Sequence, residues 1–412
     1  MNSAFHDCQQ LWINAQLATM NPLIEAPYGL LENHAIGVKG EKIAFIAPMQ
    51  DIDINKFQGK IIDAQRHYLT PGLIDSHTHL LYGGQRSGEF NQRLHGSTYE
   101  EISRAGGGIL ATVAATRALS EEELVEQARP RLEALLNEGV TTVEIKSGYG
   151  LTLKDELKML RAAKKLGADY PLRLRTTLLA AHAIPPEHIK SPDAYIELIC
   201  NQMIPQVAAE GLAEAVDVFC EKIAFSAAQS EQIFAAAQTA GLGIKVHAEQ
   251  LSNSHGTELA AGYSAWSVDH LEYLDETGVK ALKKSGTVAT LLPGAFYFLG
   301  ETKKPPVELL RQYQVPMALA SDLNPGSCPL ASLRLMLNMG CILFGLTPEE
   351  ALQGVTCHAA QALGITETTG TLSVGKAADM LLWDIDDPAQ LAYQFGEKSL
   401  RQRIFSGEIS HG

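Results

Sequence analysis

The chain lacks several features that mark whole classes of protein. No apolar run reaches the ~18 residues that a membrane-spanning helix requires, and no segment repeats at the period of a solenoid. The 6 cysteines are scattered and form no CxxC pair, which indicates reduced thiols rather than a disulfide framework. The opening residues contain no basic region followed by an apolar core, so we expect no signal peptide and a cytoplasmic protein.

Positive charge is also scarce. The 412 residues include 33 lysines and arginines against 47 acidic residues, and the formal net charge is −14. This balance argues against general binding to nucleic acid or anionic membranes, although one arginine can still dominate a pocket and bind an anionic substrate. The hydrophobic share of 46% indicates a well-buried globular protein. The length is sufficient for a barrel of about 250 residues and an accessory domain.

Short β segments occur at both ends of the chain. The candidates are residues 11–14, 35–39, 42–46, 60–63, 371–374, 380–383, 403–405 and 408–409. Each segment is too short to bury a core alone. We therefore predict one small composite β-sandwich domain that both termini build, from residues 1–66 and 364–412.

Between these ends, strand patterns alternate with helical patterns, which predicts parallel βα units. Helical periodicity covers residues 122–137, 153–166 and 330–344. The expected strand ends lie near residues 79, 146, 180, 219, 246, 270, 292 and 320. Eight such units predict an α/β fold, a (β/α)8 TIM barrel over residues 67–363. The active site of such a barrel lies at the C-terminal ends of its strands.

Residue types that bind metals gather at these strand ends. His77 and His79 follow the first strand, and side chains two positions apart on a strand point to the same side. Taken singly, His247 after the fifth strand could be a core histidine, and Asp322 after the eighth could be a turn or N-cap residue. Together the four predict one metal site. A metal so held lowers the pKa of bound water and supplies a nucleophile at neutral pH.

Asp322 and His270 are the predicted catalytic groups. The carboxylate of Asp322 could take a proton from the water and pass it to a leaving nitrogen. His270, which closes the sixth strand, could position the water or stabilise a developing oxyanion. A fourth nitrogen ligand or a structural hydrogen bond is the alternative reading of His270.

Further polar residues at the barrel mouth are candidates for substrate binding. Arg86 follows the metal-binding loop, and its guanidinium can bind a carboxylate through two parallel hydrogen bonds. Tyr149 lies between two glycines, where the backbone can turn sharply, and His182 closes the third strand. Gln250 can hydrogen-bond a ring but cannot act as a general base. General-base work is therefore assigned to Asp322 and His270, and not to Gln250 or the neighbouring Glu249.

Six segments resemble the amidohydrolase superfamily: PGLIDSHTH, KSGYG, AAHAIP, VHAEQLSN, DHLEYL and SDLNPGS. The resemblance runs through essentially the whole chain, including GTLSVGKAADMLLWD near the C-terminus. Three more specific segments, LYGGQRSGEFNQRLHGSTYEEI, KSGYGL and NPGSCP, narrow it to members that act on an imidazolone ring with a propionate tail.

The resemblance implies a metal-dependent cyclic amide hydrolase with one Zn²⁺ or Fe³⁺ per subunit. The implied reaction converts 4-imidazolone-5-propanoate to N-formimidoyl-L-glutamate in histidine degradation. It further implies that Asn324, Gly326 and Ser327 contact substrate or product, which is compatible with a turn at this segment. Lys146 is not expected to be the carbamylated bridging lysine of binuclear relatives, because the chain has no second set of ligands.

The sequence also leads to expectations about binding partners and leaves two alternative functions. We expect a homodimer that binds this small molecule and neither nucleic acid nor a membrane. One rival is a related deaminase, which would use the same metal-activated water on a heterocyclic amidine and release ammonia. The other is a non-catalytic barrel retained for binding, which would be expected to have lost metal ligands.

Overall fold

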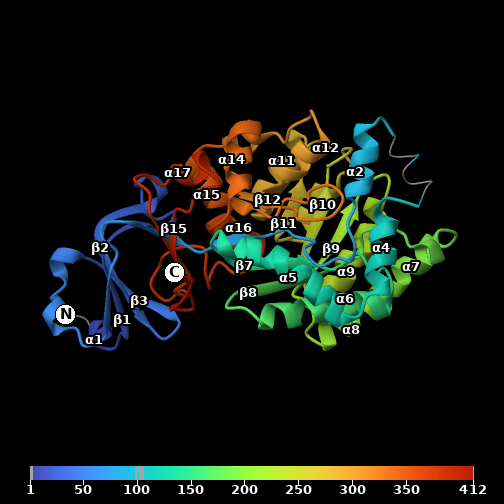
Figure 1. Ribbon diagram of the computed structural model, residues 1–412. Coiled ribbons are helices and arrows are strands. Elements are labelled where there is room, and N and C mark those ends of the chain that lie inside the picture. Colours follow the sequence, from blue (N-terminus) through green and yellow to red (C-terminus); the bar gives the residue numbers. More distant parts are fainter. Residues whose placement is uncertain (1–2, 98–100, 102–105, 412) are drawn as a thin grey trace.

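The computed structural model describes residues 3–97, 101 and 106–411, and contains two eight-stranded sheets. Thr98–Glu100 and Ile102, which belong to the LYGGQRSGEFNQRLHGSTYEEI segment, lie outside the described residues. One sheet combines strands from the two ends of the chain, and the other forms a barrel beside it (Figure 1). None of the helices in the described ranges is long and apolar enough to cross a membrane.

The barrel consists of parallel strands in chain order. They are β6 (Leu73–Asp75), β7 (Val140–Lys146), β8 (Arg173–Ala181), β9 (Ala215–Cys220), β10 (Gly243–Ala248), β11 (Ser267–His270), β12 (Val288–Leu291) and β13 (Met317–Leu319). This confirms the (β/α)8 prediction, and most strand ends fall within two residues of their predicted positions. The first strand is the exception, because β6 ends at Asp75 and the two histidines lie in the segment that follows.

The barrel closes where the segments after its first and last strands meet. Thr78 forms a parallel bridge with Leu323. The Asp322 amide donates to the His77 carbonyl at 3.0 Å, and the His79 amide donates to the Leu323 carbonyl at the same distance. Three of the four predicted metal ligands therefore lie on the seam that closes the barrel.

Local sequence explains the βα units. Every residue of β7 is buried, as expected for a parallel strand covered on both faces. The helix α5 begins with a capping box, in which Ser120 accepts from the Glu123 amide while the Glu123 side chain accepts from the Ser120 amide. The long amphipathic helices α5 (Glu121–Asn137), α6 (Leu153–Ala168) and α14 (Leu333–Phe344) confirm the predicted helical segments.

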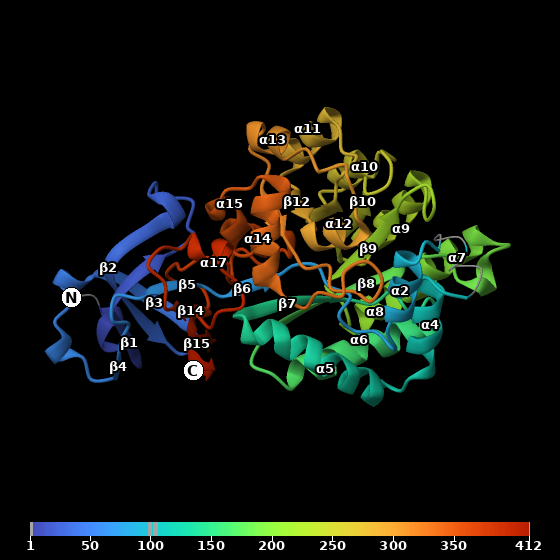
Figure 2. The same cartoon turned by 45° about the horizontal axis from the view of Figure 1, so that its top comes forward.

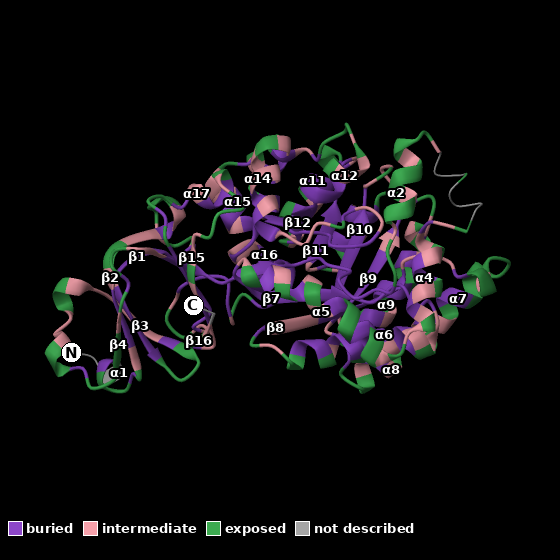
Figure 3. Cartoon of the chain, in the orientation of Figure 1, coloured by how far each residue is buried: buried purple, intermediate pink, exposed green. Residues whose placement is uncertain are grey.

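Other helices complete the layer around the strands, as Figure 2 shows from a second side. They are α2 (Ser87–Leu94), α4 (Ile109–Ala118), α7 (Pro192–Leu198), α8 (Ile204–Ala209), α9 (Ala227–Thr239), α10 (Gly256–Gly262), α11 (Glu276–Ser285), α12 (Pro293–Leu299), α13 (Val307–Gln312), α15 (Pro348–Gly354) and α16 (Cys357–Ala362). The barrel strands between them are almost entirely buried (Figure 3).

The second sheet is the predicted composite of both termini. Its strands are β1 (Gln10–Ala18), β2 (Leu30–Lys39), β3 (Lys42–Pro48), β4 (Lys60–Asp63), β5 (Tyr68–Pro71), β14 (Met380–Trp383), β15 (Leu400–Phe405) and β16 (Glu408–His411). The C-terminal β14 pairs antiparallel with the N-terminal β5. The short helices α1 (Ser3–His6) and α17 (Gln390–Tyr393) flank these strands in the chain.

One predicted strand of this domain is wrong. Residues 371–374 form no strand, because the segment makes isolated hydrogen bonds instead of a ladder: the Leu372 amide donates to the Thr19 carbonyl and the Gly375 amide to the Ile43 carbonyl. The domain boundaries at 66/67 and 363/364 stay predictions. The terminal sheet includes β5, at residues 68–71.

Candidate active site

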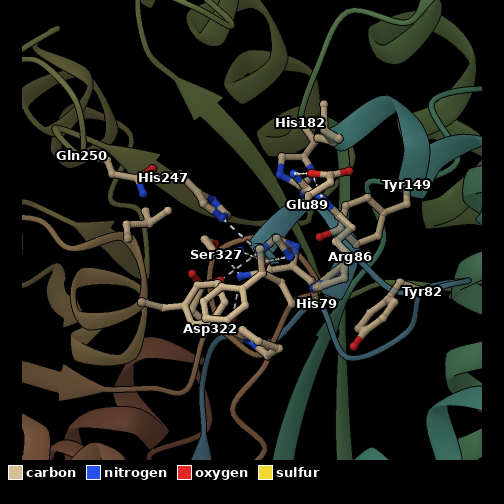
Figure 4. Close-up of a pocket in the computed structure, with 18 of the residues that line it drawn as sticks. His79, Tyr82, Arg86, Glu89, Tyr149, His182, His247, Gln250, Asp322 and Ser327 are labelled. Carbon is tan, nitrogen blue, oxygen red and sulfur yellow. Dashed lines mark hydrogen bonds and ion pairs between the residues drawn. The ribbon is translucent and has the colours of Figure 1, made fainter. Parts of the chain in front are cut away.

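A cavity of about 660 Å³ opens at the C-terminal ends of the barrel strands. Nearly all of the predicted site residues line its wall: His79, Arg86, Tyr149, His182, His247, Gln250, His270, Asp322, Asn324, Gly326 and Ser327. His77 is the exception, because it is fully buried and lies against the ring of His79. In the view of Figure 4, Arg86 and Tyr149 lie on one side of the cavity and Gln250 and His247 on the other.

Three of the four predicted metal ligands, His77, His79 and His247, present ring nitrogens that all lie within 4.8 Å of one another, and Asp322 lies beside two of them. The Nε2 atom of His79 lies 3.3 Å from Nε2 of His77 and 3.3 Å from Nε2 of His247. The Oδ1 atom of Asp322 lies 3.6 Å from Nε2 of His77 and 3.5 Å from Nε2 of His79. Two nitrogens that bind one tetrahedral ion at ~2.0–2.1 Å are about 3.4 Å apart. The three imidazole nitrogens therefore fit a single metal ion.

Two buried carboxylates fix the protonation of two of these histidines. His77 donates its Nδ1–H to Asp269 at 2.6 Å, and His247 donates its Nδ1–H to Asp217 at 3.0 Å. Because the proton of each ring is held at Nδ1, each Nε2 presents a lone pair to the metal position. The carboxylates thus orient the rings and hold the tautomer that a metal requires.

A layer of buried charge lies beneath these carboxylates. Lys146 Nζ lies 2.6 Å from Asp217 and 2.9 Å from Glu144, and Lys245 Nζ lies 3.1 Å from Glu144. All of these side chains, together with Asp269, are 0% exposed. Burial disfavours the charge of Lys146, but the surrounding carboxylates more than offset this and raise its pKa. The amine of Lys146 is therefore held as an ammonium in ion pairs, as expected for an unmodified lysine.

Burial shifts the pKa of several of the predicted metal ligands. It lowers the pKa of His77 and of His79 well below the usual value, so both rings are neutral at physiological pH. It raises the pKa of Asp322 to about 7. Burial also lowers the pKa of His270 well below its usual value, and the neighbouring His247 contributes to this shift. Neutral imidazoles are the form that binds a metal ion.

The backbone is unusual at two of the strand ends that carry predicted catalytic groups. Asp322 has a φ of 49°, His270 a φ of 87° and Leu271 a φ of 78°, all in the left-handed region that non-glycine residues rarely adopt. Such conformations cost about 1–3 kcal/mol each and persist where the surrounding structure imposes them. His270 lies in the wall of the cavity, and its Nδ1 has no hydrogen-bond partner within the described part of the chain.

His182 and Tyr149 form the wall above His79. His182 donates its Nδ1–H to the Gly148 carbonyl at 3.1 Å, and its ring stacks on His79 with 5.1 Å between centroids. Burial lowers the pKa of His182 to about 3, and the nearby His247 adds to this effect. The Nε2 of His182 is therefore an unprotonated hydrogen-bond acceptor. Burial raises the pKa of Tyr149, which keeps its phenol protonated.

The structure separates the roles of Gln250 and Glu249. Gln250 lines the cavity, whereas Glu249 is fully buried behind the wall. The Glu249 carboxylate accepts from the amides of Gly256 and Thr257 at 2.9 and 3.1 Å and from the Thr257 hydroxyl. It therefore satisfies the first turn of α10 and does not face the substrate.

Arg86 does not stand alone in the cavity wall. Its Nε and Nη2 atoms both donate to Glu89 Oε2, at 2.9 and 2.7 Å. On the opposite segment, Asn324 Oδ1 accepts from the amides of Gly326 and Ser327 at 2.8 and 2.7 Å. These hydrogen bonds fix the turn that the sequence predicts at Asn324-Pro325-Gly326.

Sequence reasoning missed the residues that support the site. Asp217 and Asp269 each lie within a short strand next to valine, a visible signal because buried carboxylates are rare unless paired. Glu89 gave no comparable signal, since an Arg-Glu pair three residues apart is an ordinary pattern on an exposed helix.

Comparison with known proteins places this geometry in context. The model of the amidohydrolase family matches residues 68–409. The chain is 58% identical to an imidazolonepropionase of Hahella chejuensis over 97% of this chain and 98% of that protein. It is 56% identical to an imidazolonepropionase of Chromobacterium violaceum, with 97% of each chain covered. An adenosine deaminase of Xanthomonas campestris with bound zinc shares the fold, with a TM-score of 0.71 at 17% identity over 98% of this chain and 93% of that one.

Proposed function

The chain belongs to the amidohydrolase family, among the imidazolonepropionases, and from this premise we propose how its residues divide the reaction. The enzyme hydrolyses the ring amide of 4-imidazolone-5-propanoate, a step of histidine degradation. Water adds to the ring carbonyl carbon, the bond from that carbon to the ring nitrogen breaks, and the product is N-formimidoyl-L-glutamate.

We assign the metal to His77, His79, His247 and Asp322. The observation that carries this proposal is the cluster of the His77, His79 and His247 ring nitrogens, with Asp322 Oδ1 within 3.6 Å of two of them. A metal ion held by these residues would supply Lewis-acid chemistry: polarisation of a carbonyl and a lower pKa for bound water. Asp269 and Asp217 hold the rings of His77 and His247 in the ligating tautomer.

Proton transfer is assigned to Asp322 with the help of His270. The carboxylate of Asp322 lies among the histidine rings at the base of the cavity, where it can accept a proton from the attacking water. Asp322 then returns that proton to the ring nitrogen as its bond to the carbonyl carbon breaks, so that the ring opens without a negative charge on that nitrogen. Burial keeps His270 neutral, and its ring N–H can donate a hydrogen bond to the oxygen that becomes negative.

The substrate is oriented by groups on the cavity wall. Arg86 binds the propionate, since it presents a guanidinium edge in the wall. His182 accepts a hydrogen bond from a ring N–H, because its own proton is committed to Gly148. Tyr149 and Gln250 bind the ring, and the Asn324–Ser327 turn contacts the substrate or the newly formed product carboxylate.

An assay of purified, metal-analysed protein with 4-imidazolone-5-propanoate tests this function. Loss of the ultraviolet absorbance of the ring without ammonia release is the expected result. Stoichiometric ammonia release would instead identify the rival deaminase. His77→Ala should lose both bound metal and activity while its circular dichroism spectrum stays unchanged, and a fully active metal-free variant would reject the metal assignment.

The identity of the metal, the assembly and the location are further parts of this proposal. We propose one Zn²⁺ or Fe³⁺ per subunit, which elemental analysis can measure. The cytoplasmic assignment is supported by the thiols Cys200, Cys220, Cys328, Cys341 and Cys357, which form no disulfide. The homodimer is supported by exposed apolar side chains on and beside α14 and α17, and light scattering tests it.

A further inference from the structure

We propose that Glu89 is the positioning residue of the carboxylate-binding arginine, and that it sets the affinity for the propionate group through Arg86. The inference rests on the proposed role of Arg86. Both side chains are mostly buried in the cavity wall, with exposures of 19% for Arg86 and 17% for Glu89. Nothing in the sequence pattern distinguishes this pair from an ordinary surface ion pair. The position of the pair in the cavity wall distinguishes it from a surface ion pair.

The first observation is which edge of the guanidinium Glu89 occupies. One carboxylate oxygen, Oε2, accepts from both Nε and Nη2 of Arg86. This leaves the edge formed by Nη1 and the second N–H of Nη2. Two donors along that edge match the two oxygens of a carboxylate in parallel. Glu89 therefore holds the arginine by one edge and leaves the other for a ligand.

The second observation is that Glu89 is itself fixed. Its other oxygen, Oε1, accepts from the amide of Gly108 at 3.0 Å, at the residue that precedes α4. Each oxygen of the carboxylate thus has a partner on a different segment, one on the Arg86 side chain and one on the backbone before α4. A long, flexible arginine is thereby tied to the scaffold before any ligand arrives.

The third observation concerns the direction of the free edge. A Cβ atom on Gly326 would overlap Nη1 of Arg86. The unoccupied edge therefore borders the Asn324–Ser327 turn in the cavity wall, next to Asp322 at the metal site. A side chain at 326 would displace the guanidinium, so the glycine leaves Arg86 in this position.

These contacts give Glu89 two opposite electrostatic effects. By holding the guanidinium, it lowers the cost of ordering Arg86 when the propionate binds. As a negative charge near the propionate, it also repels that group, and Arg86 offsets the repulsion. Removal of Glu89 should therefore weaken substrate binding when Arg86 is present. Once Arg86 has been removed, the same change should leave binding unchanged or strengthen it.

A double-mutant cycle on the metal-loaded enzyme tests this reversal. Glu89→Ala should raise KM for 4-imidazolone-5-propanoate about tenfold, equivalent to ~1.4 kcal/mol, with kcat within about twofold. Glu89→Gln keeps one acceptor oxygen and should raise KM less. In the Arg86→Ala background, adding Glu89→Ala should leave KM unchanged or lower it. A KM increase of equal size in both backgrounds would show a merely structural role and overturn the proposal.

Inhibitor binding provides a readout that does not depend on turnover. Glu89→Ala should raise Ki for imidazole-4-propanoate and leave Ki for 4-methylimidazole, which has no carboxylate, unchanged. Equal changes for both inhibitors would also overturn the proposal. The matched control is Glu126→Ala, since Glu126 pairs with Arg129 three residues away at 2.9 Å on the exposed face of α5. If Glu89→Ala does not fold, Glu89→Gln replaces it in the cycle.

Different results would reject the proposed role of Arg86 and the proposed role of Glu89. An unchanged KM in Arg86→Ala alone would reject Arg86 as the partner of the propionate. A raised KM in Arg86→Ala together with the same Glu89 effect in both backgrounds would keep Arg86 and reject Glu89 as its positioning residue.

Discussion

His77 and Asp269 form a hydrogen bond of 2.6 Å between two side chains that are both completely buried. The bond joins the segment after the first barrel strand to the end of the sixth. Because Asp269 accepts the Nδ1 proton, the metal-facing Nε2 of His77 carries a lone pair. The orientation of a proposed metal ligand is thus set by a residue that is not itself among the proposed ligands.

Asp269→Asn should weaken metal binding about 10–100-fold, because an amide can present a donor to His77 and favour the wrong tautomer. Competition against a chromophoric chelator measures the change. Asp193→Asn is a suitable control, since Asp193 is exposed and accepts a side-chain hydrogen bond from the exposed Gln229. Unchanged metal affinity in Asp269→Asn would contradict the assigned role.

Metal uptake should depend on pH through Asp322. Burial raises the pKa of this carboxyl to about 7 in the metal-free protein, and the carboxylate must be ionised to bind a cation. His77 and His79, whose pKa values are lowered, are already neutral at this pH. The apparent Kd for the metal should therefore be constant above about pH 7 and rise up to tenfold for each pH unit below it. Calorimetric titration at several pH values measures this, and a flat profile would contradict it.

Lys146→Met should destabilise the fold. The substitution would remove the lysine that pairs with the buried carboxylates of Asp217 and Glu144. Breaking a buried ion pair in this way costs ~3–5 kcal/mol. Denaturant unfolding measures the loss. Lys280→Met, which removes an exposed ion pair with Glu276, should have little effect. Mass spectrometry should also find Lys146 unmodified, and a carbamate there would refute the mononuclear assignment.

Substitutions at Glu249 and Gln250 should have different consequences. Glu249→Ala removes the acceptors for the first turn of α10 and should lower the melting temperature with little change in kcat. Gln250→Ala should leave stability unchanged and lower kcat/KM, because this side chain lies in the cavity wall. A large loss of kcat in a folded Glu249 variant would instead point to a catalytic role for that carboxylate.

The sequence was sufficient to predict the barrel and the residues that gather at its mouth. Parallel strands hold their C-terminal ends at one rim, so histidines and an aspartate that follow buried strands meet there whatever the loops do. The same reasoning does not locate β6 well, because the strand ends at Asp75 and the chain then closes the barrel through Thr78 and Leu323. Closure joins the two ends of the barrel sequence, and no local pattern encodes it.

Other features depended on contacts that the sequence pattern does not contain. The left-handed backbone at His270 and Asp322 follows from how neighbouring strands end, since neither residue type favours it strongly enough to be predicted. The segment 371–374 has strand-like composition but no adjacent edge to pair with along its length. Glu89 was overlooked because only the fold places its helix against the cavity.

The composite terminal sheet has a consequence for synthesis of the chain. β5 obtains its partner β14 only after about 310 further residues have been made, which takes roughly 15–60 s at ~5–20 residues per second. Until then, one edge of the strands at the start of the chain is open to other nascent chains. A ribosome-bound chain that stops before residue 380 should therefore need a chaperone at this edge, even when the barrel that follows it has already been synthesised.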